Sequence, residues 1–195
     1  MLLKNILAEV NTCSICEKYL PFGSQPLLQA YSDAKILIIG QAPGSIAHQS
    51  GIPWNDQSGK RLRNWMGIEK NLFYDNPRIG IISMGFCYPG RNNHGGDNPP
   101  RLECAPTWHK KILNNLNRLE LTLLVGSYAQ KYYLPGSRKN KMTENIRQWQ
   151  DYGPSIMPIP HPSWRVDGWL KKNSWFEIEL LPNLRARIQA LLDLD

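Results

Sequence analysis

The chain has 195 residues, of which 42% are hydrophobic, so it has the length and composition of one ordinary domain with a single core. Its 23 lysines and arginines outnumber its 16 acidic residues. The resulting net charge of +7 favours a polyanionic partner, although a merely soluble basic protein would have the same balance. No stretch is apolar and long enough to span a membrane, and the first ten residues do not resemble a signal peptide, which predicts a cytoplasmic protein.

Four short apolar runs predict strands that are buried on both faces, at residues 34–39, 79–84, 121–125 and 156–159. Segments with helical spacing lie between and after them, at 59–66, 107–119, 128–134, 143–152 and 175–192. This alternation predicts the α/β class, as a three-layer α/β/α sandwich around a mostly parallel four-stranded sheet. We expect residues 1–195 to form this single domain. In the last helix, core contacts are expected from Trp175, Phe176, Ile178, Leu180 and Leu181.

The four cysteines comprise one close pair and two distant members. Cys13 and Cys16 are separated by two residues, whereas Cys87 and Cys104 bracket a segment rich in proline and glycine. Four thiolates suit zinc or an iron–sulfur cluster. Buried free thiols without metal remain an alternative, and a redox dithiol at the close pair is less favoured because that pair precedes the first strand.

The loops that follow the predicted strands carry unusual residues. Residues 40–44 read Gly-Gln-Ala-Pro-Gly, residues 87–90 read Cys-Tyr-Pro-Gly, and residues 161–165 read His-Pro-Ser-Trp-Arg. The first loop lacks the Lys of a P-loop and the third Gly of a dinucleotide fingerprint, which excludes both motifs. Because ligands of parallel sheets bind outside the carboxyl ends of the strands, we expect these loops to meet at one rim.

Together these motifs resemble the uracil-DNA glycosylase superfamily, and most of all its iron–sulfur branch, family 4, over roughly residues 10–190. The resemblance rests on the 40–44 loop, the Ile-Pro-Trp that ends at Trp54, the four cysteines and the His-Pro-Ser of residues 161–163. It implies a DNA glycosylase of base excision repair that hydrolyses the N-glycosidic bond of uracil, or of a related deaminated base, in DNA. It also implies a [4Fe-4S] cluster on the cysteines, with zinc as the second choice. We expect a monomer.

The resemblance assigns roles to residues around the base pocket. His161 would donate a hydrogen bond to the leaving base, and Trp54 would stack on the extruded base. The backbone of Gln41 and Ala42 would line the pocket. No lysine stands in these motifs, so hydrolysis without a Schiff-base lyase step is expected.

Two features depart from the family pattern. The second residue of the glycine loop is Gln41 where family 4 usually has Glu, and residues 45–48, Ser-Ile-Ala-His, contain no carboxylate. Gln41 and His48 are therefore the nearest substitutes for the group that activates water. Ser83 stands where these enzymes often present an Asn to the uracil edge, and a serine hydroxyl reaches less far than an amide.

Ser163, Trp164 and Arg165 would contact DNA at the minor groove, with Trp164 as the wedge that fills the gap left by the extruded base. The same segment, up to Trp169, would also suit a protein-binding face, because Trp and Arg are enriched at such surfaces.

Structural and functional alternatives stay open at this point. Trp54 could be a hydrophobic anchor, His48 a solvated loop histidine, and His161 a histidine hydrogen-bonded to backbone. A different function would be that of a catalytically weak nucleic-acid-binding protein that recognises a modified base. A hydrolase acting on a free nucleoside is a third candidate, and its ligand binding would depend little on salt.

Overall fold

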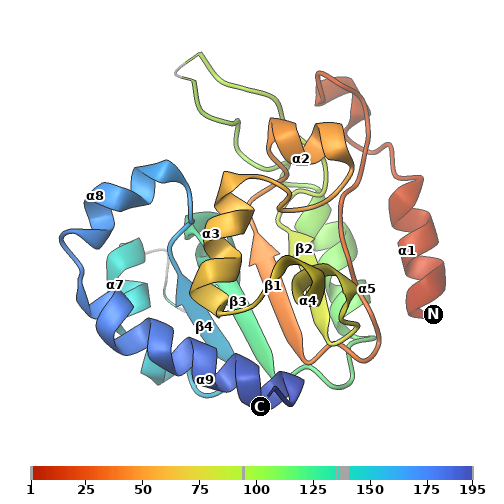
Figure 1. Ribbon diagram of the computed structural model, residues 1–195. Helices are drawn as coiled ribbons and strands as arrows, with labels where there is room; N and C mark the ends of the chain where they lie inside the picture. Colours follow the sequence, from red (N-terminus) through yellow and green to blue (C-terminus); the bar gives the residue numbers. More distant parts are fainter. Residues whose placement is uncertain (1, 94, 135, 137–140, 195) are drawn as a thin grey trace.

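A four-stranded parallel sheet forms the centre of the computed structural model, which describes residues 2–93, 95–134, 136 and 141–194. The strands are β1 (Ile36–Gly40), β2 (Ile79–Ser83), β3 (Leu121–Val125) and β4 (Ile156–Ile159), in the order β2-β1-β3-β4. All carboxyl ends therefore point the same way, towards α2 (Ser45–Ser50) at the top of Figure 1. The predicted fold class is confirmed, and every predicted strand is found within two residues of its expected bounds.

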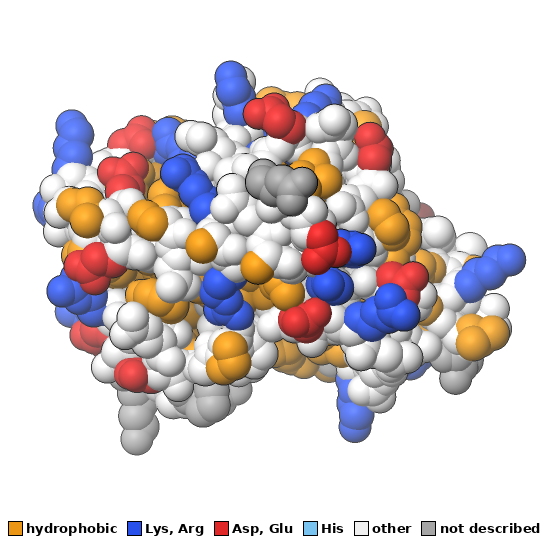
Figure 2. Space-filling view, turned by 60° about the horizontal axis from the view of Figure 1, so that its bottom comes forward, with side chains coloured by type: hydrophobic (Ala, Val, Ile, Leu, Met, Phe, Trp, Pro, Cys, Tyr) orange, Lys and Arg blue, Asp and Glu red, His pale blue; other side chains and the backbone are white. Residues whose placement is uncertain are grey.

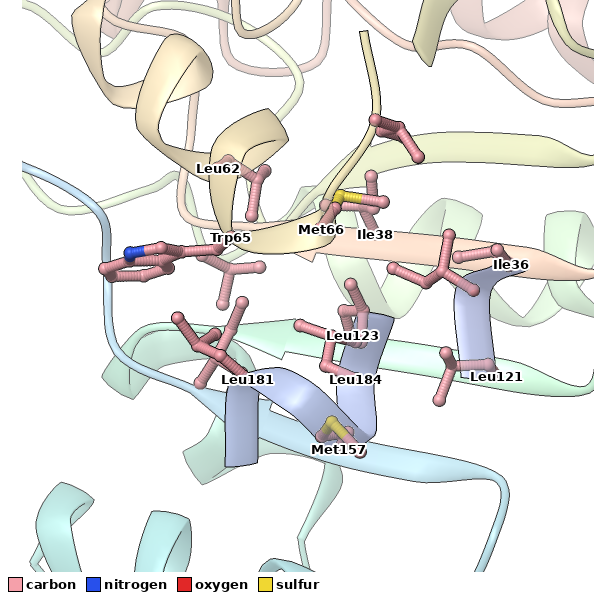
Figure 3. Packing of buried hydrophobic residues seen from close by; sticks show 14 of the residues in the cluster. Ile36, Ile38, Leu62, Trp65, Met66, Leu121, Leu123, Met157, Leu181 and Leu184 are labelled. Carbon is pink, nitrogen blue, oxygen red and sulfur yellow. The ribbon is translucent and has the colours of Figure 1, made fainter. Parts of the chain in front are cut away.

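Helices cover both faces of the sheet, because alternate side chains of each strand point to opposite sides. On one side Ile36 and Ile38 pack against α3 (Gln57–Met66), α4 (Lys70–Asp75) and α9 (Leu181–Leu192) (Figure 3). On the other side Leu37 and Ile39 pack against α1 (Leu3–Asn11), α5 (Lys110–Leu113) and α6 (Ser127–Tyr133). The result is a sandwich of three layers with two cores.

Shorter elements complete the described chain. The helices α7 (Met142–Arg147) and α8 (Asp167–Leu170) flank β4, and short helical turns occur at Glu17–Tyr19, Trp149–Tyr152 and Trp164–Val166. None of the helices within the described residues is long and apolar enough to cross a membrane. On the face turned forward in Figure 2, lysines and arginines are interspersed with aspartates and glutamates, so this side has no single sign of charge.

The helix expected over 107–119 is shorter than predicted. It begins as a π-helical turn at Ala105–His109 and continues as α5 only to Leu113. Asn115 follows, and its side-chain amide donates to the carbonyl of Lys111, so it competes with the helical backbone for that acceptor. The helix expected over 143–152 is likewise split into α7 and the turn at Trp149–Tyr152.

The predicted last helix contains an irregular first part. Residues Phe176–Leu180 form a π-helical turn before α9, because Pro182 has no N–H to donate to the carbonyl of Ile178. The expectation that Ile178 contacts the core is wrong, since this side chain is 71% exposed. The other four expected contacts of this segment are buried or partly buried in the core.

Candidate active site

A cleft of about 520 Å³ lies at the carboxyl ends of the strands. Eight residues that the sequence singles out line it together: Gln41, Ala42, Trp54, Ser83, His161, Ser163, Trp164 and Arg165. Residues 91, 92 and 95–97 of the long loop after β2 also line it. The loops after three different strands therefore meet at one rim, as the parallel topology requires.

Trp54 forms a wall of this cleft and is held by two glycines. Its ring stacks on the ring of His161 with centroids 5.5 Å apart, and only 8% of the residue is exposed. A Cβ added to Gly40 would lie 2.7 Å from this indole, and one added to Gly59 would lie 1.7 Å from the carbonyl oxygen of Trp54. Only glycine permits this packing, so the first turn of α3 and the end of β1 together fix the ring.

His161 follows β4 and is partly buried beside Gly126, which has φ +84 at the end of β3. Burial lowers the pKa of His161, and the negative charge of Asp56 opposes that effect. The imidazole is therefore neutral at neutral pH and carries one N–H that can donate to a ligand.

Two carboxylates in the cleft were missed by the sequence reasoning. Asp56 caps α3, with Oδ1 accepting from the N–H of Gly59 at 2.7 Å. A Cβ on Gly44 would lie 3.6 Å from Oδ2 of both Asp56 and Asp97, so both carboxylates face the glycine loop. Partial burial raises the pKa of Asp97, and the guanidinium of Arg91 opposes this. A signal for Asp56 existed, because it stands two residues after Trp54 at a typical N-cap position.

Ser83 ends β2, and the backbone that follows it is held by hydrogen bonds. The N–H of Met84 donates to the carbonyl of Gly40 at 2.9 Å, and that of Gly85 donates to Gln41 at 3.0 Å. The carbonyl of Ser83 accepts from Nε2 of the buried His109 at 3.0 Å. The loops after β1 and β2 are thus joined, and the hydroxyl of Ser83 is held beside the end of β1.

The segment after His161 projects from the molecule. Trp164 is 72% exposed, and the guanidinium of Arg165 lies 5.0 Å from the centroid of its ring. Arg61 on α3 holds the base of the segment, because it donates to the carbonyl of Ser163 at 2.9 Å and pairs with Asp167. An exposed tryptophan on such an anchored support can be inserted into a partner without rearranging the cleft.

His48 does not line the cleft. It lies on α2, where its ring packs against Phe22 at 5.5 Å and Tyr88 at 5.7 Å, in a neighbouring hollow. It is partly buried rather than a solvated loop residue, and its Nδ1 is a buried atom without a hydrogen-bond partner within the described part of the chain.

The four cysteines come together from three segments of the chain. None forms a disulfide, and Cys16, Cys87 and Cys104 are buried. Burial, together with negative charge on the other three cysteines, raises the pKa of Cys104 to about 12. The four thiols lie within electrostatic range of one another, and three of them are buried. A metal centre would neutralise the negative charge of their thiolates.

The chemistry of these side chains suits either of two centres. Four thiolates can hold one zinc ion, or they can each bind one iron of a four-iron cluster. Within the described residues, no group of three or more Cys, His, Asp or Glu side chains is placed to hold a metal ion.

Comparison with known proteins agrees with the geometry. Residues 28–185 match the Uracil DNA glycosylase superfamily. A type-4 uracil-DNA glycosylase of Sulfurisphaera tokodaii is 26% identical over 144 residues, which are 74% of this chain and 61% of that protein. The chain thus spans about three-fifths of the length of this curated relative.

Proposed function

Because the chain belongs to the uracil DNA glycosylase superfamily, we propose that it removes uracil, or a related deaminated base, from DNA by hydrolysis of the N-glycosidic bond. The observation that carries this proposal is the pairing of a neutral His161 with the carboxylate of Asp56 in one cleft. One group can donate to a leaving base, and the other can act on water.

The two groups suit the charges that develop as this bond breaks. The base leaves as an anion, which the N–H of His161 stabilises by a hydrogen bond. The sugar becomes cationic, and the carboxylate of Asp56 both stabilises that charge and orients the attacking water. Trp54 supports the ring of His161 and offers its small exposed part to the base. Ser83 and the backbone of Gln41 and Ala42 contact the edge of the base.

DNA is the proposed partner, and Trp164 is the proposed wedge. An exposed aromatic ring with a guanidinium over it can enter the space that an extruded nucleotide leaves. Ser163 and Arg165 then contact the adjoining backbone. One wedge and one cleft suffice for this step, so we propose that the single domain acts as a monomer.

We further propose that Cys13, Cys16, Cys87 and Cys104 hold a [4Fe-4S] cluster. Two observations support this proposal. The four cysteines form no disulfide and three of them are buried, and the chain matches a type-4 relative. The cluster would cross-link the segment before β1 to the loop after β2, which forms a wall of the cleft, and its chemistry would be structural.

The alternative of a binding module that recognises a base without cutting was suggested by the loss of a carboxylate from residues 41–48. Asp56 supplies a carboxylate from another segment, and this favours hydrolysis.

The test is strand cleavage after alkali of an end-labelled oligonucleotide with one uracil, in single- and double-stranded form. Asp56→Asn is the sharpest variant, since Asn caps a helix as well as Asp but cannot carry the charge. We expect a loss of about 10²–10⁴-fold in the single-turnover rate. His161→Ala should lose about 10²–10³-fold.

Tyr31→Ala is the control, because Tyr31 is an exposed aromatic residue that lines a separate hollow together with Pro77. Its rate should equal that of the wild type. Absence of cleavage by a folded, metal-loaded wild type on every substrate would reject the hydrolytic function, and retained DNA binding would then favour the binding module.

A further inference from the structure

A second hollow, of about 490 Å³, adjoins the cleft on the side of α2. Its lining consists of three aromatic rings, three polar side chains and one cation: Phe22, His48, Tyr88, Gln25, Ser45, Gln49 and Arg91. Arg91 lines both this hollow and the cleft, and Ser45 directly follows Gly44, which lines the cleft. The two hollows are therefore neighbours that share one guanidinium.

The three aromatic rings contact one another, and Phe22 is the most exposed of them. The rings of Phe22 and Tyr88 are stacked, with centroids 5.8 Å apart and an angle of 16° between them. His48 is tilted against both rings. Tyr88 is buried, yet Phe22 is 65% exposed, so one face of the phenyl ring is covered while much of the residue meets water. A rigidly backed aromatic face in water is the kind of surface on which an unpaired nucleobase stacks.

The polar groups around the rings fit the rest of a nucleotide. Arg91 is exposed and stands between the two hollows, where a phosphate joining two successive nucleotides would lie. Gln25 donates to the carbonyl of His48 at 3.2 Å, which fixes the end of α2 under the rings. Ser45 hydrogen-bonds to Tyr88 and holds that ring in place.

We propose that this hollow binds the nucleotide next to the extruded one, with its base on Phe22 and the intervening phosphate on Arg91. The inference rests on the proposed function and deepens it, because it names the substrate as single-stranded or locally opened DNA. A base that is paired and stacked within a duplex is not free to reach Phe22. His48 then has a positioning role beneath the stacking ring.

The probe is a single-stranded oligonucleotide with a non-hydrolysable 2′-fluoro deoxyuridine and a fluorescent 2-aminopurine on either its 5′ or its 3′ side. With the wild type we expect quenching of the 2-aminopurine on one side only. Phe22→Ala should abolish that quenching and weaken the affinity for this oligonucleotide by about tenfold. Phe22→Trp should keep the quenching and the affinity of the wild type. Phe22→Leu, which keeps the apolar contact but has no ring, should lose both.

Controls separate this proposal from the glycosylase function. Tyr31→Ala should bind and quench as the wild type does, and equal unfolding midpoints should show that the exposed Phe22 is not needed for folding. Unchanged quenching and affinity in Phe22→Ala would overturn the proposal even if uracil is excised normally. Quenching that depends on Phe22 in a protein that excises nothing would preserve the hollow as a DNA site and reject only the hydrolytic step. No binding of any single strand would overturn the proposal, whereas the glycosylase function would still be decided by excision from double-stranded DNA.

Discussion

His109 is a buried histidine beside Ser83, and both of its ring nitrogens have hydrogen-bond partners. Nε2 of His109 faces the carbonyl of Ser83, which can only accept, so Nε2 carries the proton. Nδ1 then accepts from the hydroxyl of Tyr133 at 2.5 Å. Burial lowers the pKa of His109 to about 4. The neutral ring is thus the form that supports the end of β2 at physiological pH.

This arrangement predicts that the free energy of unfolding falls as the pH drops from about 6.5 to 4. In that window His109 binds a proton in the unfolded chain but not in the folded one. This difference favours the unfolded state by about 3 kcal/mol at most. In His109→Gln, whose amide cannot titrate, the profile from urea unfolding at several pH values should be flatter.

His161 contributes in the same direction, since its pKa is also lowered. His161→Gln is therefore the matched control, and it should keep the part of the slope that His109 causes. Parallel profiles for wild type and His109→Gln would contradict the prediction.

At the scale of elements, two close contacts decide where Trp54 stands. The first turn of α3 presses against the backbone of Trp54, which has φ 59, and Gly59 is the contact point. The end of β1 meets the indole at Gly40. The cleft therefore depends on how closely a helix and a strand approach one residue between them.

Gly59→Ala should consequently destabilise the protein. In a free helix the same change would stabilise the helix by about 1 kcal/mol. A Cβ at 1.7 Å from a backbone oxygen forces the helix to move, at a cost of about 1–3 kcal/mol or more. Uracil excision should fall as well, because Trp54 moves with its support. Chemical unfolding and single-turnover rates measure the two effects.

Gly168→Ala in α8 is the matched control. Nothing lies within 4 Å of the Cβ that it would add, so stability should stay equal or rise slightly, with excision unchanged. Equal effects of the two substitutions would show that α3 has room to adjust.

The elements that sequence could predict are those whose signal is local. The four strands are short apolar runs, and a parallel sheet places the loops after them at one edge, so His161, Gln41 and Ser83 could be expected together. The position of Asp56 depends on how α3 docks against Trp54, which no local pattern contains. The exposure of Ile178 depends on the irregular turn before Pro182, and the hollow around His48 depends on a ring, Phe22, from a distant segment.

At the scale of the molecule, the proposed cluster would join the segment before β1 to the loop after β2. Removal of iron by chelation, or Cys16→Ser, should lower the midpoint of thermal unfolding, because a centre that binds only the folded state stabilises it. Loss of the link should also weaken DNA binding, since Arg91 and Asp97 lie between Cys87 and Cys104. Iron and sulfide content, thermal unfolding and DNA affinity are the measurements.

Ser14→Ala, between the paired cysteines, is the control and should retain iron, sulfide and the unfolding midpoint. A purified protein with stoichiometric zinc and no sulfide would contradict the cluster, and an unchanged midpoint after chelation would contradict its structural role.

The separation of the cysteines along the chain also orders events during synthesis. Cys13 and Cys16 leave the ribosome early, but Cys87 and Cys104 follow only after β1 and β2 have emerged. Until then the first two thiols have no partners from the same chain and are open to oxidation or to capture by stray metal. Rapid pairing of β1 with β2, which brings the later loop towards the waiting thiols, would shorten the interval in which the nascent protein is vulnerable.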